Sequence, residues 1–210
     1  DWDASPPALL WKQPAGDGYA SFVVANGLAY TLEQRRDREA LVAYELLTGR
    51  EIWILEWPGR FEEALSKPGP RATPVLATVP GAPGDDGDGT LVVLGQGALG
   101  ELRCARAHDG EPLWRRNVLA DAGAENLEYG TAASPLVVGD LVIAVSGAPV
   151  SAVVDGVVVP TPRPGGATGT LIAYDLATGE PRWSALYERM AYVSPFAAEL
   201  AGRPQIVLAT

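Results

Sequence analysis

The stretch Leu171-Ile172-Ala173-Tyr174-Asp175-Leu176-Ala177-Thr178-Gly179-Glu180-Pro181-Arg182-Trp183 decides the fold, because a version of it occurs three times within 210 residues. The other two copies span residues 41–53 and 102–114, and the middle copy is the loosest of the three. Leucine comes first, glycine ninth and tryptophan thirteenth in every copy. The glycine recurs after 61 and then 69 residues. A period of that length indicates a repeat architecture built from one supersecondary unit.

Each copy reads as a β-hairpin. A short run of residues typical of strands leads to a Thr-Gly or Asp-Gly pair, and the returning run ends in tryptophan. Glycine suits this turn because it adopts a positive φ without strain. A second hairpin precedes each copy, within residues 19–32, 71–94 and 131–146. Four antiparallel strands per unit, with no helix between them, favour a β-propeller blade over a helical array or a horseshoe.

The chain therefore predicts an all-β fold, a partial β-propeller of about three and a half blades over residues 1–210. The expected blades are listed here: 19–57, 71–118, 129–187 and the start of another at 192–210. Residues 9–14 contain a tryptophan, Trp11, and are interpreted as a lone strand of the closing blade. We expect a fragment of a ring of seven or eight blades, within the usual range for propellers.

The conserved positions of the repeat are interpreted as structural. Tryptophan at one fixed blade position would fill the gap between adjacent sheets, because a buried indole supplies a large apolar area. The residues assigned to this role are Gly49, Trp53, Gly110, Trp114, Gly179 and Trp183. No ligand contact is expected from them.

The copy at 171–183 resembles the repeat of the PQQ-like β-propellers, the superfamily of quinoprotein alcohol dehydrogenases and of BamB-like assembly proteins. The runs at 72–75, 133–142 and 194–196 are similar to the first strand of that repeat. The resemblance covers nearly the whole chain. It implies a periplasmic or extracellular location and a propeller fold, and it leaves the activity open, because members carrying the repeat need not bind the quinone.

Composition narrows the class of partner. The formal net charge is −10 and 47% of residues are hydrophobic, which fits a globular protein. The acidic balance argues against a nucleic-acid partner, because phosphate binding needs a basic face. No apolar run is long enough to span a membrane, and no signal peptide is present in these residues. Cys104 is the only cysteine, so no disulfide can form within the chain, and its motif position predicts a buried side chain.

Few residues carry chemistry. The only histidine, His108, precedes an Asp-Gly turn and is expected to be solvated, so neither a catalytic triad nor a zinc site is predicted. No catalytic residue is assigned. Asp85, Asp86 and Asp88 are candidate calcium ligands, since closely spaced aspartates can supply several oxygens from one loop. The alternative is a solvated connection, because Asp and Gly also dominate ordinary turns.

Two insertions enlarge the expected blades. Residues 59–70 join the first blade to the second and could hold one helical turn. Residues 148–168 contain an apolar run broken at Asp155-Gly156, which predicts an extra hairpin before a proline-rich segment. Long loops on a rigid scaffold often bind partners, although an insertion that packs only on its own blade fits equally well. Glu125, Asn126 and Glu128 lie between blades, where ligand contacts could arise or where a polar loop simply meets solvent.

The resemblance implies what a quinone centre would require: a tryptophan, a disulfide between adjacent cysteines, and calcium held by acidic and amide side chains. A single cysteine excludes that disulfide here. The favoured function is therefore a non-enzymatic, BamB-like scaffold for protein binding, with no cofactor. The first alternative is a PQQ- and calcium-dependent oxidoreductase whose site lies mainly outside this segment. The second is binding of a small ligand or sugar in the propeller funnel.

Open sheet faces at both ends of the arc also predict a partner, because exposed apolar faces and unpaired strand edges recruit other chains. The expected partners are the remaining propeller blades, a second copy through self-association of the open ends, or another protein.

Overall fold

The computed structural model describes residues 3–81, 87–147, 151–154, 157–160, 169–188 and 192–209. Within these ranges the chain forms three four-stranded antiparallel sheets, two two-stranded sheets and one short helix. The all-β propeller architecture expected from the repeat is thereby confirmed. None of the helical structure described has the length or hydropathy needed to cross a bilayer.

Each four-stranded sheet follows the chain order of its strands. The first contains β1 (Val23–Ala25), β2 (Leu28–Arg35), β3 (Arg38–Glu45) and β4 (Glu51–Pro58). The second contains β5 (Val75–Val79), β6 (Thr90–Gln96), β7 (Glu101–Arg106) and β8 (Pro112–Asn117). The third contains β9 (Leu136–Val138), β10 (Leu141–Val145), β13 (Leu171–Asp175) and β14 (Pro181–Ala185). A fourth unit is present as the hairpin of β15 (Phe196–Leu200) and β16 (Arg203–Val207).

The repeated sequence forms the last two strands of each four-stranded sheet. Its ninth residue is a glycine with a φ of +71°, +76° or +73°, and the glycine N–H donates to the carbonyl four residues earlier at 2.8–2.9 Å. The strand register shifts at one equivalent place in the three hairpins, after Ala43, Cys104 and Ala173. The same turn and the same bulge therefore follow from the same sequence.

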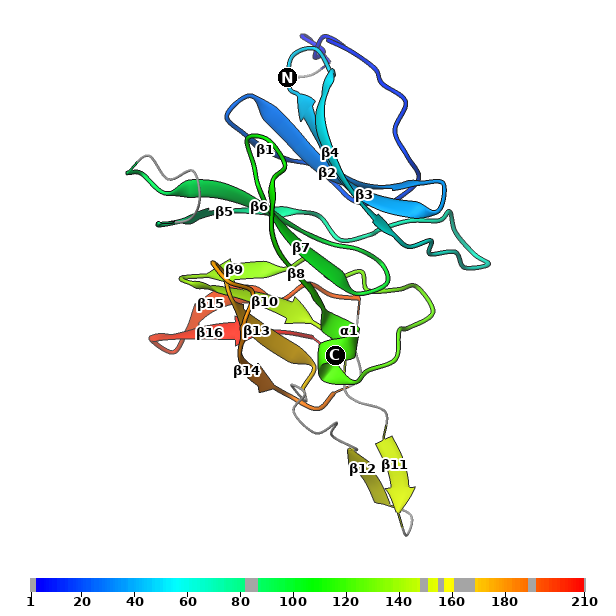
Figure 1. Ribbon diagram of the computed structural model, residues 1–210, viewed down its shortest axis with the longest axis vertical. Helices are drawn as coiled ribbons and strands as arrows, with labels where there is room; N and C mark the ends of the chain where they lie inside the picture. Colours follow the sequence, from blue (N-terminus) through cyan, green and yellow to red (C-terminus); the bar gives the residue numbers. More distant parts are fainter. Residues whose placement is uncertain are drawn as a thin grey trace.

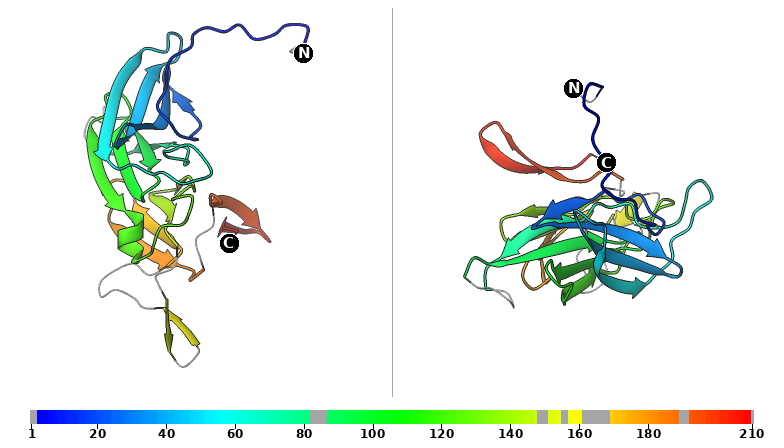
Figure 2. Two further views of the ribbon diagram at one scale, coloured as in Figure 1. Left: turned by 90° about the vertical axis from the view of Figure 1, so that its right-hand side faces the viewer. Right: turned by 90° about the horizontal axis from the view of Figure 1, so that it is seen from above.

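The sheets are arranged as consecutive blades. In Figure 1 they follow one another along the long axis, and Figure 2 shows the β15–β16 hairpin standing beside the third sheet. The first strands make successive contacts, β1 with β5, β5 with β9, and β9 with β15. This is the arrangement of inner strands around a propeller axis.

The core lies between the sheets. One buried cluster joins the first and second sheets and includes Tyr30, Leu41, Trp53 and Ala105. A second joins the second and third sheets through Leu94, Cys104, Ile172 and Tyr174. A smaller third cluster packs Ile143 and Ala173 against Ile206 and Leu208 of the last hairpin. Each sheet thus buries a face only through its neighbour, as the repeat reading requires.

Three local expectations have different outcomes. Residues 59–70 contain turns and no helix, so the expected helical turn there is wrong. The helix, α1 (Val118–Ala122), instead follows the second sheet, where the Asn117 side chain caps its start and Gly123, with a φ of +65°, ends it. The extra hairpin is confirmed as β11 (Ser151–Val154) paired with β12 (Val157–Pro160), which project from the stack in Figure 1.

Residues 9–14 form no β-strand in this structure. A strand is defined by ladder hydrogen bonds to a neighbour, and no strand in the described part of the chain lies beside this run. Leu9 and Leu10 are 81% and 68% exposed. Trp11 is nevertheless held against the first sheet, by contacts described below.

Candidate binding face

Adjacent sheets are joined by one repeated contact between a tryptophan and a glycine. Trp53 on β4 donates its indole N–H to the Ala107 carbonyl of the second sheet at 2.9 Å. Its ring covers Gly110, where a Cβ atom would lie 2.7 Å from the indole carbons. Trp114 makes the same contact one sheet further, with the Leu176 carbonyl at 2.9 Å and with Gly179.

The first and last members of this series differ. Trp11 donates to the Leu46 carbonyl at 2.8 Å, and its ring lies 2.4 Å from where a Cβ on Gly49 would be. The segment before β1 therefore supplies the tryptophan that a preceding blade would supply. Trp183 is 37% exposed, at the end of the third sheet.

A chain of hydroxyl groups links the inner strands around the axis. Each member donates its backbone N–H to the hydroxyl of the equivalent residue in the next unit. The bonds are Ser21 to Thr73 at 3.3 Å, Thr73 to Ser134 at 2.8 Å, and Ser134 to Ser194 at 2.8 Å. These bonds fix the rotation between neighbouring blades close to the axis.

The long connections gather at one edge of the sheets, which we call the connection edge. Because the strands alternate in direction, the connections from β4 to β5, β8 to β9 and β14 to β15 all fall there, together with the β11–β12 insertion. In Figure 1 the first two of these connections lie on the right. The opposite edge, the turn edge, carries mainly tight turns such as Asn26-Gly27 and Gly139-Asp140.

At the connection edge, Arg71 is held between two aromatic rings. Its guanidinium carbon lies 5.3 Å from the ring centroid of Tyr19 and 4.9 Å from that of Phe61. It also pairs with Glu63 at 3.1 Å, and both charged side chains are nearly buried. The Ser66 hydroxyl and the Leu65 N–H donate to Glu63 and hold the pKa of its carboxyl below the usual range. Cation–π contact and ion pairing together fix the geometry of this loop.

The aromatic contacts continue toward the last hairpin. Phe61 touches the next connection, since a Cβ on Gly130 would lie 3.2 Å from the Phe61 ring. The Tyr129 and Tyr192 rings meet edge to face at 5.3 Å, and the Tyr192 hydroxyl accepts the Tyr129 N–H at 3.3 Å. The neighbouring Glu128 carboxylate raises the pKa of Tyr129.

We call these residues the aromatic band. It runs across four successive units and comprises Tyr19, Phe61, Arg71, Tyr129 and Tyr192. Tyr19 and Tyr192 are 52% and 41% exposed, so the band has a solvent-facing surface. Sequence reasoning did not find this band. Its members share no spacing, and only the stacking of the blades brings them together.

The residues singled out from the sequence lie apart from one another. Cys104 is buried in the core between the second and third sheets, and burial raises the pKa of its thiol to about 12. The His108 side chain is 90% exposed at the turn edge. Asp88 lines a hollow at the same edge, whereas Asp85 and Asp86 fall outside the described residues. The calcium hypothesis for these three aspartates stays a prediction.

The polar loop at 125–128 belongs to the connection edge. Asn126 donates its side-chain amide to the Ala98 carbonyl at 2.9 Å and so anchors the loop on the second sheet. Glu125 and Glu128 are exposed beside the aromatic band. These two carboxylates make the surface of the connection edge acidic at this loop.

A calcium-bound quinone would need six to eight oxygen ligands for its metal. In the described part of the chain, no group of three or more His, Cys, Asp or Glu residues has the geometry of a metal site. Beside the inner strands lies the hydroxyl series from Ser21 to Ser194. This set does not fit the metal–quinone centre, and we derive no redox step from it.

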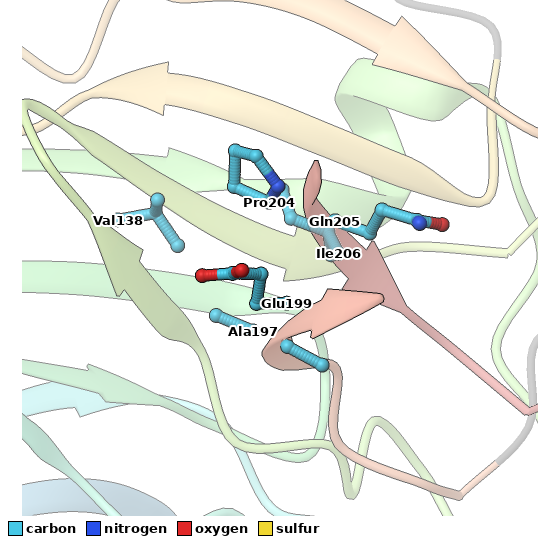
Figure 3. Close-up of a pocket in the computed structure, with 7 residues that line it drawn as sticks. Val138, Ala197, Glu199, Pro204, Gln205 and Ile206 are labelled. Carbon is cyan, nitrogen blue, oxygen red and sulfur yellow. The ribbon is translucent and has the colours of Figure 1, made fainter. Parts of the chain in front are cut away.

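Hollows occur between consecutive units. One of about 510 Å³ lies between β9 and the last hairpin, with Val138 on one side and Ala197, Glu199, Pro204 and Ile206 on the other (Figure 3). Two more, of about 470 and 550 Å³, lie between the second and third sheets and between the first and second sheets. The first is mainly apolar, and all of its lining residues except Val138 belong to the unit that has only two strands here.

The family model described as outer membrane protein assembly factor BamB matches residues 1–155. The chain belongs to the BamB family. Among curated proteins none matches it.

Solved structures similar to the chain include BamB from Moraxella catarrhalis, at 15% identity and a TM-score of 0.47, covering 83% of this chain and 41% of that one. A quinohemoprotein alcohol dehydrogenase from Pseudomonas putida HK5 has 17% identity and a TM-score of 0.45, covering 81% and 20%. Another from Comamonas testosteroni has 12% identity and a TM-score of 0.45, covering 91% and 39%. The chain thus spans less than half the length of each of these proteins.

Proposed function

We propose that this chain is a rigid, non-enzymatic scaffold that binds protein partners in the periplasm and takes part in outer membrane protein assembly. Membership of the BamB family supports the proposed role in outer membrane protein assembly. We further propose that residues 1–210 are part of a larger ring, because each sheet here buries its faces only against a neighbouring unit.

The aromatic band is the observation that carries the binding role. Tyrosine and arginine are enriched among the residues that dominate the binding energy of protein interfaces. Arg71 is already fixed by two rings and an ion pair, and Tyr192 by its bond to the next loop. A surface ordered in advance loses less entropy on binding, which supports a role for this edge in recognition.

Site-specific photo-cross-linking tests the proposal. A photoreactive amino acid at Leu65, which is 76% exposed beside the Arg71 cluster, should give adducts with components of the outer membrane protein assembly machinery in cells. The matched control is Leu47, which is 71% exposed in a turn at the opposite edge and should give none. Equal adducts from both positions, or normal outer membrane protein levels after Tyr19→Ala and Tyr192→Ala together, would contradict the proposal.

The quinoprotein alternative predicts a different result. Titration of the protein with PQQ and calcium, followed by calorimetry, should show no stoichiometric binding if the chain is a scaffold. Binding in the micromolar range or tighter would replace the scaffold by an oxidoreductase.

A further inference from the structure

The hollow between the first and second sheets differs from the other two in its chemistry. It measures about 550 Å³, within the range of small-molecule sites, and lies at the turn edge, away from the aromatic band. Its polar lining includes Asn26, Tyr30, Asp88, Arg106, His108 and Asp109. The side chains come from the first hairpin of the first sheet and from the second sheet, so the site exists only where the two blades meet.

Tyr30 is the central residue of this hollow. It is 1% exposed, and its ring lies 5.9 Å from that of Trp53. Its hydroxyl makes no hydrogen bond to any residue in the described part of the chain, although it lines the hollow. The oxygen is not among the fully buried atoms that lack a partner, so it is reached from the hollow and can bond a molecule that enters it.

The repeat shows that this hydroxyl is not part of the common blade design. Tyr30 pairs across the sheet with Ala43, and the equivalent residue of the second sheet is Leu94, which pairs with Cys104. The equivalent residue of the third sheet is Ile143, which pairs with Ala173. Packing alone would therefore accept an apolar residue at position 30.

The other polar groups surround this hydroxyl with both donors and acceptors. Arg106 binds Asp109 through two hydrogen bonds of 2.8 and 2.6 Å, which hold the pKa of Asp109 below its usual value. Asp88 adds a carboxylate and His108 an exposed imidazole. An anionic ligand would meet two carboxylates, and a cationic ligand would meet the guanidinium. Neutral hydroxyl groups can both donate and accept, so they satisfy all of these side chains.

We propose that this inter-blade hollow binds a small neutral polyhydroxylated ligand, a sugar of one or two rings, with the Tyr30 hydroxyl at the wall of the hollow as a hydrogen-bond partner. Leu28 and Leu91 supply an apolar wall for the carbon face of the sugar. The hollow between the second and third sheets has neither an aromatic hydroxyl nor a basic side chain in its lining and is the internal comparison. This site is independent of the scaffold role.

His108 provides a direct readout, because it is the only histidine in the chain and gives a single set of imidazole NMR signals. Glucose, galactose, N-acetylglucosamine and maltose are titrated into the protein while these signals are followed. At least one sugar should give a saturable shift, with a dissociation constant of about 1 mM. Succinate should give none.

Tyr30→Phe removes only the hydroxyl and should weaken binding roughly fivefold to tenfold, the loss of one hydrogen bond. Its melting temperature should not fall, since no partner in the described residues loses a bond. Tyr187→Phe, at an exposed residue of the connection edge, is the matched control and should bind as the wild type does. The proposal is overturned by the absence of a saturable shift with every sugar, by equal affinity in Tyr30→Phe, or by a response to succinate alone.

Discussion

Replacing Gly110 with alanine tests the contact that joins the blades. The new Cβ would lie 2.7 Å from Cδ2 and Cε3 of Trp53, so the indole must move. Gly27 is the matched control, because its φ of +78° is close to the +76° of Gly110 and nothing lies within 4 Å of its Cβ position. Both substitutions carry the same backbone strain, and only Gly110→Ala disturbs a neighbour.

The expected magnitudes follow from these geometries. Left-handed strain of about 1–2 kcal/mol, partly offset by a stiffer unfolded chain, gives a loss of about 1 kcal/mol for Gly27→Ala. Gly110→Ala adds overpacking of about 1–3 kcal/mol. It also strains the 2.9 Å bond from Trp53 to the Ala107 carbonyl, worth about 1 kcal/mol. Gly110→Ala should therefore lower the free energy of unfolding by about 2–4 kcal/mol more than Gly27→Ala.

Urea titrations of both variants, monitored by far-UV circular dichroism, measure this difference. The same pair is then made in a Trp53→Ala background, where the indole is absent. There Gly110→Ala should cost no more than Gly27→Ala. If Gly110→Ala still lowered the free energy of unfolding by more than Gly27→Ala in that background, the clash with Trp53 would not be the cause. The role given to the tryptophan–glycine contact between blades would then be refuted.

Other predictions address buried polar groups. Glu39→Ala should lower the free energy of unfolding by about 2–4 kcal/mol, because it leaves two buried donors without an acceptor. These donors are the Ala98 N–H and the Trp57 indole N–H, which bond the carboxylate at 2.7 and 3.0 Å. An unchanged urea midpoint would contradict this prediction. Burial raises the pKa of Glu39 above 4.5. The burial of its charged form therefore destabilises the fold fully above the folded pKa, and this destabilisation fades as the pH falls toward 4.5. Urea titrations at several pH values should show wild type gaining stability relative to Glu39→Gln on acidification. Cys104, with a pKa of about 12, should resist a thiol reagent at pH 8 until urea unfolds the chain. Ser134→Ala removes the acceptor of the Thr73 N–H and should lower the melting temperature, whereas Ser5→Ala, at an exposed residue, should not.

The sequence predicted the features that depend on local chemistry. The Gly-containing turns and the alternating strands lie inside single hairpins, so residues close in sequence determine them. The helix α1 was missed although its signals are present, an Asn117 cap and a glycine at its end, because a five-residue helix has almost no periodicity. The helical turn expected at 59–70 failed because that loop is organised by Arg71 and its rings instead.

The binding face and the hollow could not be predicted because they depend on contacts between blades. Ala105 stands where the other two copies have tyrosine, and Tyr30 of the preceding sheet lies in the same cluster. An aromatic ring thus reaches that interface from the opposite side, and no pattern within one repeat reveals it. Arg71 meets Tyr19 across 52 residues for the same reason, since only the rotation between blades sets their distance.

The position of Trp11 gives the arc a direction. At one end the pocket over Gly49 is filled by a residue tethered to the same polypeptide, while at the other Trp183 remains partly exposed. Part of the Trp183 ring is open to solvent, although the β15–β16 hairpin already packs against the same sheet. Any other tryptophan that approached Gly49 would compete with Trp11 as an intramolecular ligand, and the effective concentration of such a ligand on a short flexible tether is in the millimolar range. The two ends of the series are therefore unequal, because only the glycine at its start is already covered by an indole.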